Sequence, residues 1–143
     1  MILYLHTSSL LKLYVEETGS DEVEGSAREA ASVASSLVAY AEARAALARA
    51  HRDRRLTTRT YRTLVRTFED QWPSYTAVGV AESIVRLAGN LAEKHALRGF
   101  DAIHLASAMA LRDNLQEPVA FSAADEALMA AAKAEGLSTV PSR

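Results

Sequence analysis

Five short runs of apolar or β-branched residues recur along the chain, separated by longer segments in which apolar positions repeat every three or four residues. The short runs fit β-strands and the longer segments fit helices. The expected strands are residues 2–5, 32–34, 75–80, 119–121 and 137–140. Strands that alternate with helices are typical of a parallel sheet covered by helices on both faces. The pattern therefore predicts an α/β fold with a parallel central sheet flanked by helices.

The helical segments have recognisable starts and stops. Thr7, Ser8 or Ser9 can cap a helix that ends at Gly19 and Ser20. Further helices are expected over residues 21–31, about 36–52, 58–71, 84–97, 100–114 and 124–135. The segment 36–52 is rich in alanine and arginine, which are strong helix formers, and it is expected to be the longest helix.

Length and composition narrow the class of protein. A chain of 143 residues is most simply a single domain, here taken as residues 1–143. It has no cysteine, which excludes disulfides and thiolate metal sites. It shows neither a secretion signal nor an apolar run long enough to cross a membrane, so we expect a cytoplasmic protein. The net charge of −2 argues mildly against a nucleic-acid binder, although acidic residues gathered around a metal would distort that count.

The densest basic run is residues 51–55, His-Arg-Asp-Arg-Arg. One interpretation is a solvated helix end, where cations interact favourably with the helix dipole. The other is a contact with the phosphate backbone of a nucleic acid. The sequence leaves both open.

Four residues stand where an α/β fold would gather them. His6 directly follows the first strand, and Asp125 follows the strand 119–121 within four residues. Asp101 lies in the first turn of a helix, and Glu42 lies about two turns into the helix that follows the second strand. Ligands of open α/β sheets bind beyond the carboxyl ends of the strands, so we expect these four side chains to converge there in one pocket.

Each of the four also has a local interpretation. Asp101 can interact with the helix dipole, and Glu42 can pair with an arginine on the helix surface. Asp125 can be a helix N-cap, and His6 can be a hydrogen-bonded core histidine. The joint arrangement is more informative than any one residue, because the four come from four different junctions of the expected sheet. Converging carboxylates repel one another unless a cation offsets their charge.

A hard divalent cation fits such a cluster of oxygen ligands. Bound metal ions of this kind can activate a water molecule and stabilise the leaving oxygen of a phosphodiester. Metal-assisted phosphodiester hydrolysis is therefore the reaction class that best suits this set of carboxylates.

Four motifs follow one another along the chain: Leu3-Tyr4-Leu5-His6-Thr7-Ser8, Ala41-Glu42-Ala43-Arg44, Phe100-Asp101-Ala102-Ile103-His104-Leu105-Ala106 and Phe121-Ser122-Ala123-Ala124-Asp125. In this order they resemble the PIN-domain ribonucleases, most closely the VapC-type toxins of toxin–antitoxin pairs, and the resemblance extends over essentially the whole chain. The resemblance implies a PIN-like fold and an endoribonuclease toxin of a type II toxin–antitoxin system that depends on Mg²⁺ or Mn²⁺. It also implies an RNA substrate, a cognate VapB-type antitoxin and a homodimer.

By the same resemblance, Glu42, Asp101 and Asp125 occupy three acidic positions of the catalytic and metal-binding site. His6 occupies the fourth, where the family has aspartate, and Asp101 and position 6 would be the principal metal ligands. Thr7 or Ser8 would support the site. His104 lies three residues after Asp101 and either packs and hydrogen-bonds behind the site or takes a direct catalytic role.

The histidine changes the expected chemistry, because imidazole offers one neutral nitrogen where a carboxylate offers two charged oxygens. Mg²⁺ prefers oxygen ligands. We therefore expect weakened or absent activity, from either a natural variation or an introduced inactivating substitution.

There are two alternatives to an active nuclease: a catalytically dead PIN-fold protein that acts through antitoxin or dimer contacts, and a signalling receiver domain. The receiver is disfavoured because residues 75–80 lead into Ala81-Glu82, without the aspartate that receivers place after their third strand.

Overall fold

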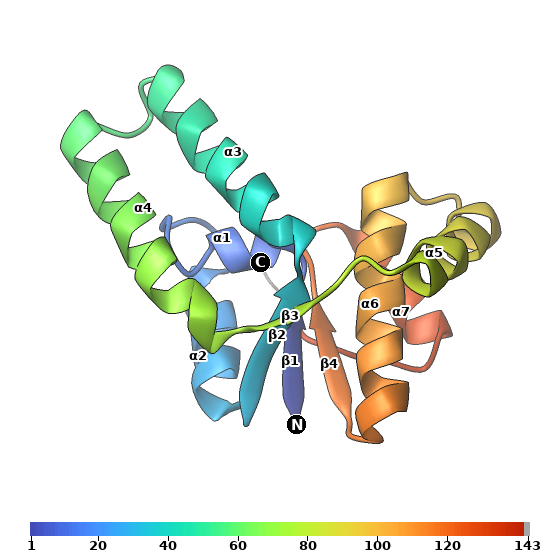
Figure 1. The fold of residues 1–143 in the computed structure, drawn as a ribbon. Coiled ribbons are helices and arrows are strands. Elements are labelled where there is room, and N and C mark those ends of the chain that lie inside the picture. The colour runs from blue at the N-terminus through green and yellow to red at the C-terminus, as the bar shows by residue number, and fades with distance from the viewer. Residues whose placement is uncertain (142–143) are drawn as a thin grey trace.

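The central sheet has five parallel strands in the order β3-β2-β1-β4-β5, as seen in a computed structural model that describes residues 1–141 (Figure 1). The strands are β1 (Ile2–Leu5), β2 (Ser32–Ser36), β3 (Thr76–Val78), β4 (Val119–Ser122) and β5 (Ser138–Thr139). β1 lies in the middle, with Leu3 opposite Val33 on one side and Ala120 on the other. All five expected strands are present, and the prediction of a parallel sheet is confirmed.

Helices cover both faces of this sheet, α1 to α4 on one side and α5 to α7 on the other (Figure 1). Their bounds are α1 (Thr7–Leu11), α2 (Ser20–Glu29), α3 (Val38–Arg52), α4 (Thr58–Gln71), α5 (Glu82–His95), α6 (Gly99–Leu115) and α7 (Glu126–Ala134), with a 3₁₀ turn, η1 (Trp72–Ser74), after α4. Among the described residues, no helix is both long enough and apolar enough to cross a membrane.

The two faces are built by the alternation of side chains along β1. Ile2 and Tyr4 point into the core under α5, α6 and α7, whereas Leu3 and Leu5 point into the core under α1, α2, α3 and α4. All four side chains are buried. A strand buried on both faces reads as a continuous apolar run, which is why the first strand was recognisable in the sequence.

Two expectations about the helices are wrong. The first helix ends at Leu11 instead of continuing to Gly19, which precedes α2 with a left-handed φ of 95° and so begins a helix. The longest helix is α6 with 17 residues, whereas α3 has 15. α3 is shorter than expected because Ser35 and Ser36 extend β2, where the Ser35 hydroxyl donates a hydrogen bond to the Leu5 carbonyl.

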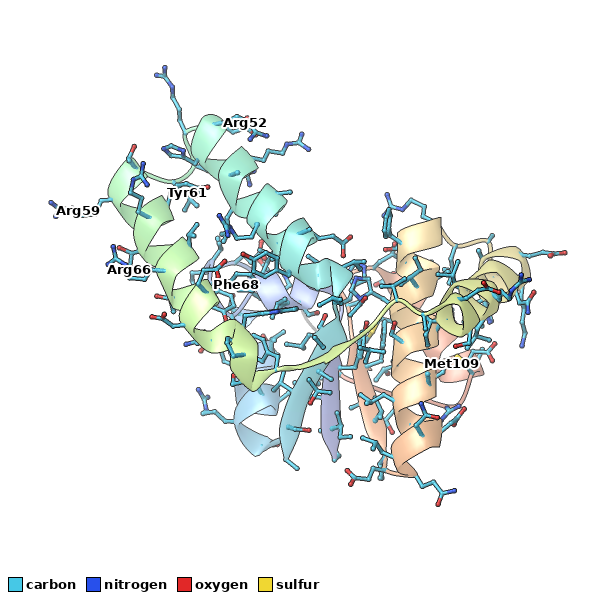
Figure 2. All side chains as sticks on the ribbon, in the orientation of Figure 1. Arg52, Arg59, Tyr61, Arg66, Phe68 and Met109 are labelled. Carbon is cyan, nitrogen blue, oxygen red and sulfur yellow. The ribbon has the colours of Figure 1, made fainter. Side chains whose placement is uncertain are left out.

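Helices α3 and α4 form a hairpin that projects from the body of the protein, here called the arm (residues 38–71; Figure 1). Phe68 of α4 is fully buried at its base and faces inward (Figure 2). Its ring contacts those of Tyr14, Tyr40 and Trp72, with centroid distances of 5.3 to 5.7 Å. This aromatic cluster attaches the arm to the sheet.

We predict that Phe68→Ala lowers the free energy of unfolding by about 3–5 kcal/mol, because it removes a large buried ring and leaves a cavity. The matched control is Phe100→Ala, since the Phe100 side chain is 59% exposed. Urea denaturation of both variants measures the difference. Equal losses for the two would contradict the role given to Phe68.

Candidate active site

A pocket of about 510 Å³ opens at the carboxyl edge of the sheet, where β1, α1, α3 and α6 meet. Three of the four expected site residues line it: His6, Glu42 and Asp101. The other lining residues are Thr7, Ser8, Arg98, Gly99 and Phe100. His6 lies there because it follows β1 directly, and Asp101 because it lies in the first turn of α6, as expected.

His6 has two roles in this pocket. It is the N-cap residue of α1, where its Nδ1 accepts a hydrogen bond from the backbone N–H of Ser8 at 3.1 Å. A backbone N–H can only donate, so Nδ1 is the unprotonated nitrogen, and the Ser8 hydroxyl lies 2.8 Å from it. The proton is therefore on Nε2, which donates to Oδ1 of Asp101 at 2.8 Å. The imidazole therefore forms a hydrogen bond with one carboxylate oxygen of Asp101, a residue expected from the sequence to be a metal ligand.

Asp101 is held ionised by its neighbours. The hydrogen bond from His6 is the largest influence, and it outweighs burial to hold the pKa of Asp101 below its ordinary value. Arg98, one turn earlier, adds a contact from its Nε to Oδ2 at 3.2 Å. The Arg98 side chain is 86% exposed, so this pair contributes little to stability. Both oxygens of Asp101 therefore have partners from the chain.

Glu42 reaches the pocket from α3 and is paired with a second histidine. Its Oε1 accepts hydrogen bonds from the Thr7 hydroxyl at 2.7 Å and from Nε2 of His104 at 2.9 Å. Burial acts to raise the pKa of Glu42, but these hydrogen bonds outweigh it and hold the pKa below its ordinary value. Glu42 is therefore a carboxylate anchored to α1 and α6.

His104 lies behind the pocket with its side chain fully buried. Its Nδ1 accepts from the hydroxyl of Tyr4 at 2.9 Å, and its Nε2 donates to Glu42. Burial lowers the pKa of His104 in spite of the nearby carboxylates, so the ring is neutral. Burial also raises the pKa of Tyr4 far above its ordinary value, which keeps its proton available for this bond. Among the interpretations of His104, this geometry favours hydrogen bonding behind the site.

Asp125 is placed differently from the other three. It is the N-cap of α7, and its Oδ1 accepts from the backbone N–H groups of Ala127 at 2.8 Å and Leu128 at 3.2 Å. It is not among the residues that line the pocket. The preceding residue does reach the site, because the Ala124 N–H donates to the Ser8 hydroxyl at 3.0 Å. Asp125 therefore follows a residue that contacts the site, while its own carboxylate caps α7.

The present arrangement does not fit a divalent cation held by oxygen ligands. Asp101 and Glu42 each turn an oxygen towards an imidazole, and the rings of His6 and His104 lie between them with centroids 4.5 Å apart. Within residues 1–141, no three histidine, cysteine or acidic side chains are grouped as metal ligands. Position 6 supplies a nitrogen where Mg²⁺ prefers oxygen.

Two residues of the site were not anticipated from the sequence. Tyr4 orients His104 through a hydrogen bond. In the sequence, the only sign of this role was that Tyr4 carries the one hydroxyl in an otherwise aliphatic strand. Arg98 pairs with Asp101 at the i, i+3 spacing of a helix, a signal that the sequence contained.

The five-stranded parallel sheet with acidic side chains at its carboxyl edge agrees with the expected PIN-like α/β fold. The structure is similar to the crystal structure of FitAcB from Neisseria gonorrhoeae, with a TM-score of 0.70, 17% sequence identity, and coverage of 97% of this chain and 96% of that chain. At this identity the likeness concerns the fold alone. No family model matches the chain.

Two curated relatives from Mycobacterium tuberculosis are closer in sequence. Ribonuclease VapC45 (strain CDC 1551 / Oshkosh) and ribonuclease VapC49 (strain ATCC 25618 / H37Rv) are each 40% identical over 112 residues, which is 78% of this chain and 78% of each relative. The chain therefore belongs to the VapC family of ribonucleases.

We predict that Tyr4→Phe lowers the free energy of unfolding by about 1–3 kcal/mol, because it leaves Nδ1 of His104 buried without its donor. Tyr61→Phe is the matched control, since no hydrogen bond of the Tyr61 hydroxyl is found among the described residues. Thermal denaturation reports the cost, and the ¹⁵N shifts of His104 report the altered ring. Unchanged His104 shifts in Tyr4→Phe would show that this hydrogen bond does not form.

Proposed function

We propose that this chain is an endoribonuclease toxin of a type II toxin–antitoxin system, with a catalytic site weakened by His6. The observation that carries the proposal is the gathering of Glu42, Asp101 and the position-6 side chain in one pocket at the carboxyl edge of the sheet. The 40% identity to proteins named ribonucleases supports the same reaction class. The substrate is RNA, and we place the protein in the cytoplasm, where such substrates occur.

The site residues have different parts in this proposal. Asp101, Glu42 and the position-6 residue form the metal-binding and catalytic set, and Asp125 contributes a further carboxylate if its capping bonds are given up. Thr7 and His104 orient Glu42. Ser8 orients the position-6 side chain. With aspartate at position 6, these residues would hold Mg²⁺ or Mn²⁺, and the ion would supply the activation of water that phosphodiester hydrolysis needs.

The weakened activity follows from the hydrogen bond between His6 and Asp101. A ring nitrogen 2.8 Å from Oδ1 occupies the place at which the carboxylate would meet a cation. An aspartate at position 6 could not donate that bond and would repel Asp101, so the pair would require a cation between them. Displacement of a reacting group by about 1 Å can cost roughly 10²-fold in rate.

We predict that His6→Asp cleaves RNA at least about 10²-fold faster than the parent chain in Mg²⁺ or Mn²⁺. The matched control is the double variant His6→Asp/Asp101→Asn, which should lose that gain. Gel assays on a mixed RNA pool, with and without a chelator, make the measurement.

Equal cleavage by parent and His6→Asp would overturn the inhibitory role of His6. No cleavage by either form would favour the second candidate, a catalytically dead PIN-fold protein that acts through its partners. That candidate rests on the imidazole of His6, which pairs with Asp101 where the family resemblance implies an aspartate. In both cases the expected partners are a VapB-type antitoxin and a second copy of the chain.

The homodimer that the family resemblance implies needs an apolar contact surface, and α6 leaves only part of its apolar side chains exposed. Half of the apolar side chains of α6 are buried within the chain itself, including Ala102, Leu105 and Leu111. The exposed apolar residues nearby are Val85, at 45%, and Phe100, at 59%. They line a shallow apolar pocket of about 290 Å³ between α5 and α6, which is the place we propose for contact between two copies.

We predict a dimer by light scattering at micromolar concentration, and a shift towards monomer in Val85→Glu, because a buried unpaired charge is costly. Val80→Glu is the matched control, with Val80 38% exposed and outside this pocket. A parent chain that is monomeric, or a dimer that withstands Val85→Glu, would contradict the assignment of this surface.

A further inference from the structure

The outer end of the arm carries most of the arginine in the protein. Residues 49–66, here called the tip, contain seven arginines and one acidic residue, Asp53. The rest of the chain has nine basic and seventeen acidic residues, so the tip is strongly basic on an acidic protein. The seven are Arg49, Arg52, Arg54, Arg55, Arg59, Arg62 and Arg66, and all are exposed.

Most of these charges are not used by the fold. Asp53 has long contacts of 3.7 and 3.8 Å with Arg49 and Arg55. The other five arginines have no ion pair among the described residues. Figure 2 shows Arg52, Arg59 and Arg66 extending away from the body of the protein. Like charges held close together without partners destabilise a fold, so a ligand of opposite charge would relieve this repulsion.

The tip arginines form an ordered surface. Arg59, Arg62 and Arg66 follow one another at i, i+3 and i+7 on α4, which puts them on one face of the helix. Their spacing along the axis is roughly 4.5 and 6 Å at 1.5 Å per residue. At the turn between the helices, a pocket of about 410 Å³ is lined by His51, Arg52, Arg54, Leu56, Thr57 and Thr58. The guanidinium groups of Arg52 and Arg54 there can donate to phosphate oxygens.

We propose that the tip of the arm is a docking surface for the phosphate backbone of the RNA substrate, which deepens the proposed ribonuclease function and rests on it. Arginine is suited to this ligand because its planar fork donates two parallel hydrogen bonds to a phosphate. The tip contains arginine and no lysine, although the chain has lysine elsewhere. The three α4 arginines lie on one helix face, where they can contact successive phosphates of one strand.

The arm connects this surface to the pocket. Glu42 lines the pocket near the start of α3, and Arg52 ends the same helix ten residues later. That separation is about 15 Å along the axis, which several successive phosphates of one strand can span. The tip thus binds RNA beyond the point of cleavage, so it sets how strongly a long RNA is held and has no effect on a very short one.

The test compares two triple variants that change net charge equally. Arg59→Gln/Arg62→Gln/Arg66→Gln removes the α4 stripe, and glutamine keeps a helix propensity close to that of arginine. The matched control is Arg28→Gln/Arg86→Gln/Lys133→Gln, three exposed cations outside the arm. Binding of a fluorescent single-stranded RNA and of a labelled trinucleotide is measured on the whole parent chain and both variants. Salt is varied between about 50 and 200 mM.

The stripe variant should bind the long RNA about tenfold or more weakly, and the slope of log K against log salt should fall by roughly 0.7 for each phosphate that the variant no longer neutralises. The trinucleotide should bind all forms alike. Arg59→Lys/Arg62→Lys/Arg66→Lys should restore much of the affinity for long RNA. A control variant as weak as the stripe variant would overturn the proposal, because bulk charge would then explain the effect.

Polyglutamate serves as a model of an acidic protein segment, and its binding is measured on the same forms. If the stripe variant binds RNA as the parent does but loses binding to polyglutamate, the proposal is overturned and the tip is assigned to an acidic protein segment. These outcomes do not depend on RNA cleavage, because the experiment measures RNA binding and every form that it compares keeps His6. If His6→Asp fails to cleave RNA while the stripe variant still loses RNA affinity, the ribonuclease function fails and the docking surface stands.

Discussion

A fully buried imidazole cannot leave either nitrogen unpaired without a cost of about 1–3 kcal/mol, and His104 meets this demand with residues from three other elements. Tyr4 of β1 serves one nitrogen, while Glu42 of α3 and Thr7 of α1 surround the other. The bonds fix the start of α3 and the middle of α6 against the end of β1. The pocket at the carboxyl edge is the space that this arrangement leaves open.

The negative charge of that pocket is partly compensated by groups of the chain itself. Glu42 and Asp101 both have pKa values below their ordinary range, so both carry negative charge at neutral pH. In a cluster of carboxylates a cation would offset this charge. Here hydrogen bonds from His104, Thr7, His6 and Arg98 supply part of the compensation. The His6 side chain therefore bonds Asp101 within the protein, at an oxygen that our proposal assigns to a metal.

The parts of the fold predictable from sequence were those with a strong periodic or apolar signal. β1 and β4 are buried on both faces and read as apolar runs, and the placement of His6, Glu42 and Asp101 followed from the rule that parallel strands end at one edge. The first helix was extended too far because the apolar residues 13–15 favour its continuation, whereas the helix ends at Leu11 and the Lys12 ammonium donates to the Thr18 carbonyl. Asp125 illustrates a competition that sequence cannot resolve, since the same carboxylate can cap α7 or turn towards the pocket. The role of Tyr4 depends on a partner a hundred residues away, and no local pattern encodes it.

We infer that the hydrogen bond from His6 compensates the negative charge of Asp101 in the place of a cation. The most direct measurement is the binding of Mn²⁺, followed by electron paramagnetic resonance, to the parent chain and to His6→Asp without RNA. We expect the parent chain to leave Mn²⁺ free in solution and His6→Asp to bind it. The double variant His6→Asp/Asp101→Asn should lose that binding. Equal Mn²⁺ affinity in the parent and in His6→Asp would contradict the account, because the imidazole would then not stand between Asp101 and the metal.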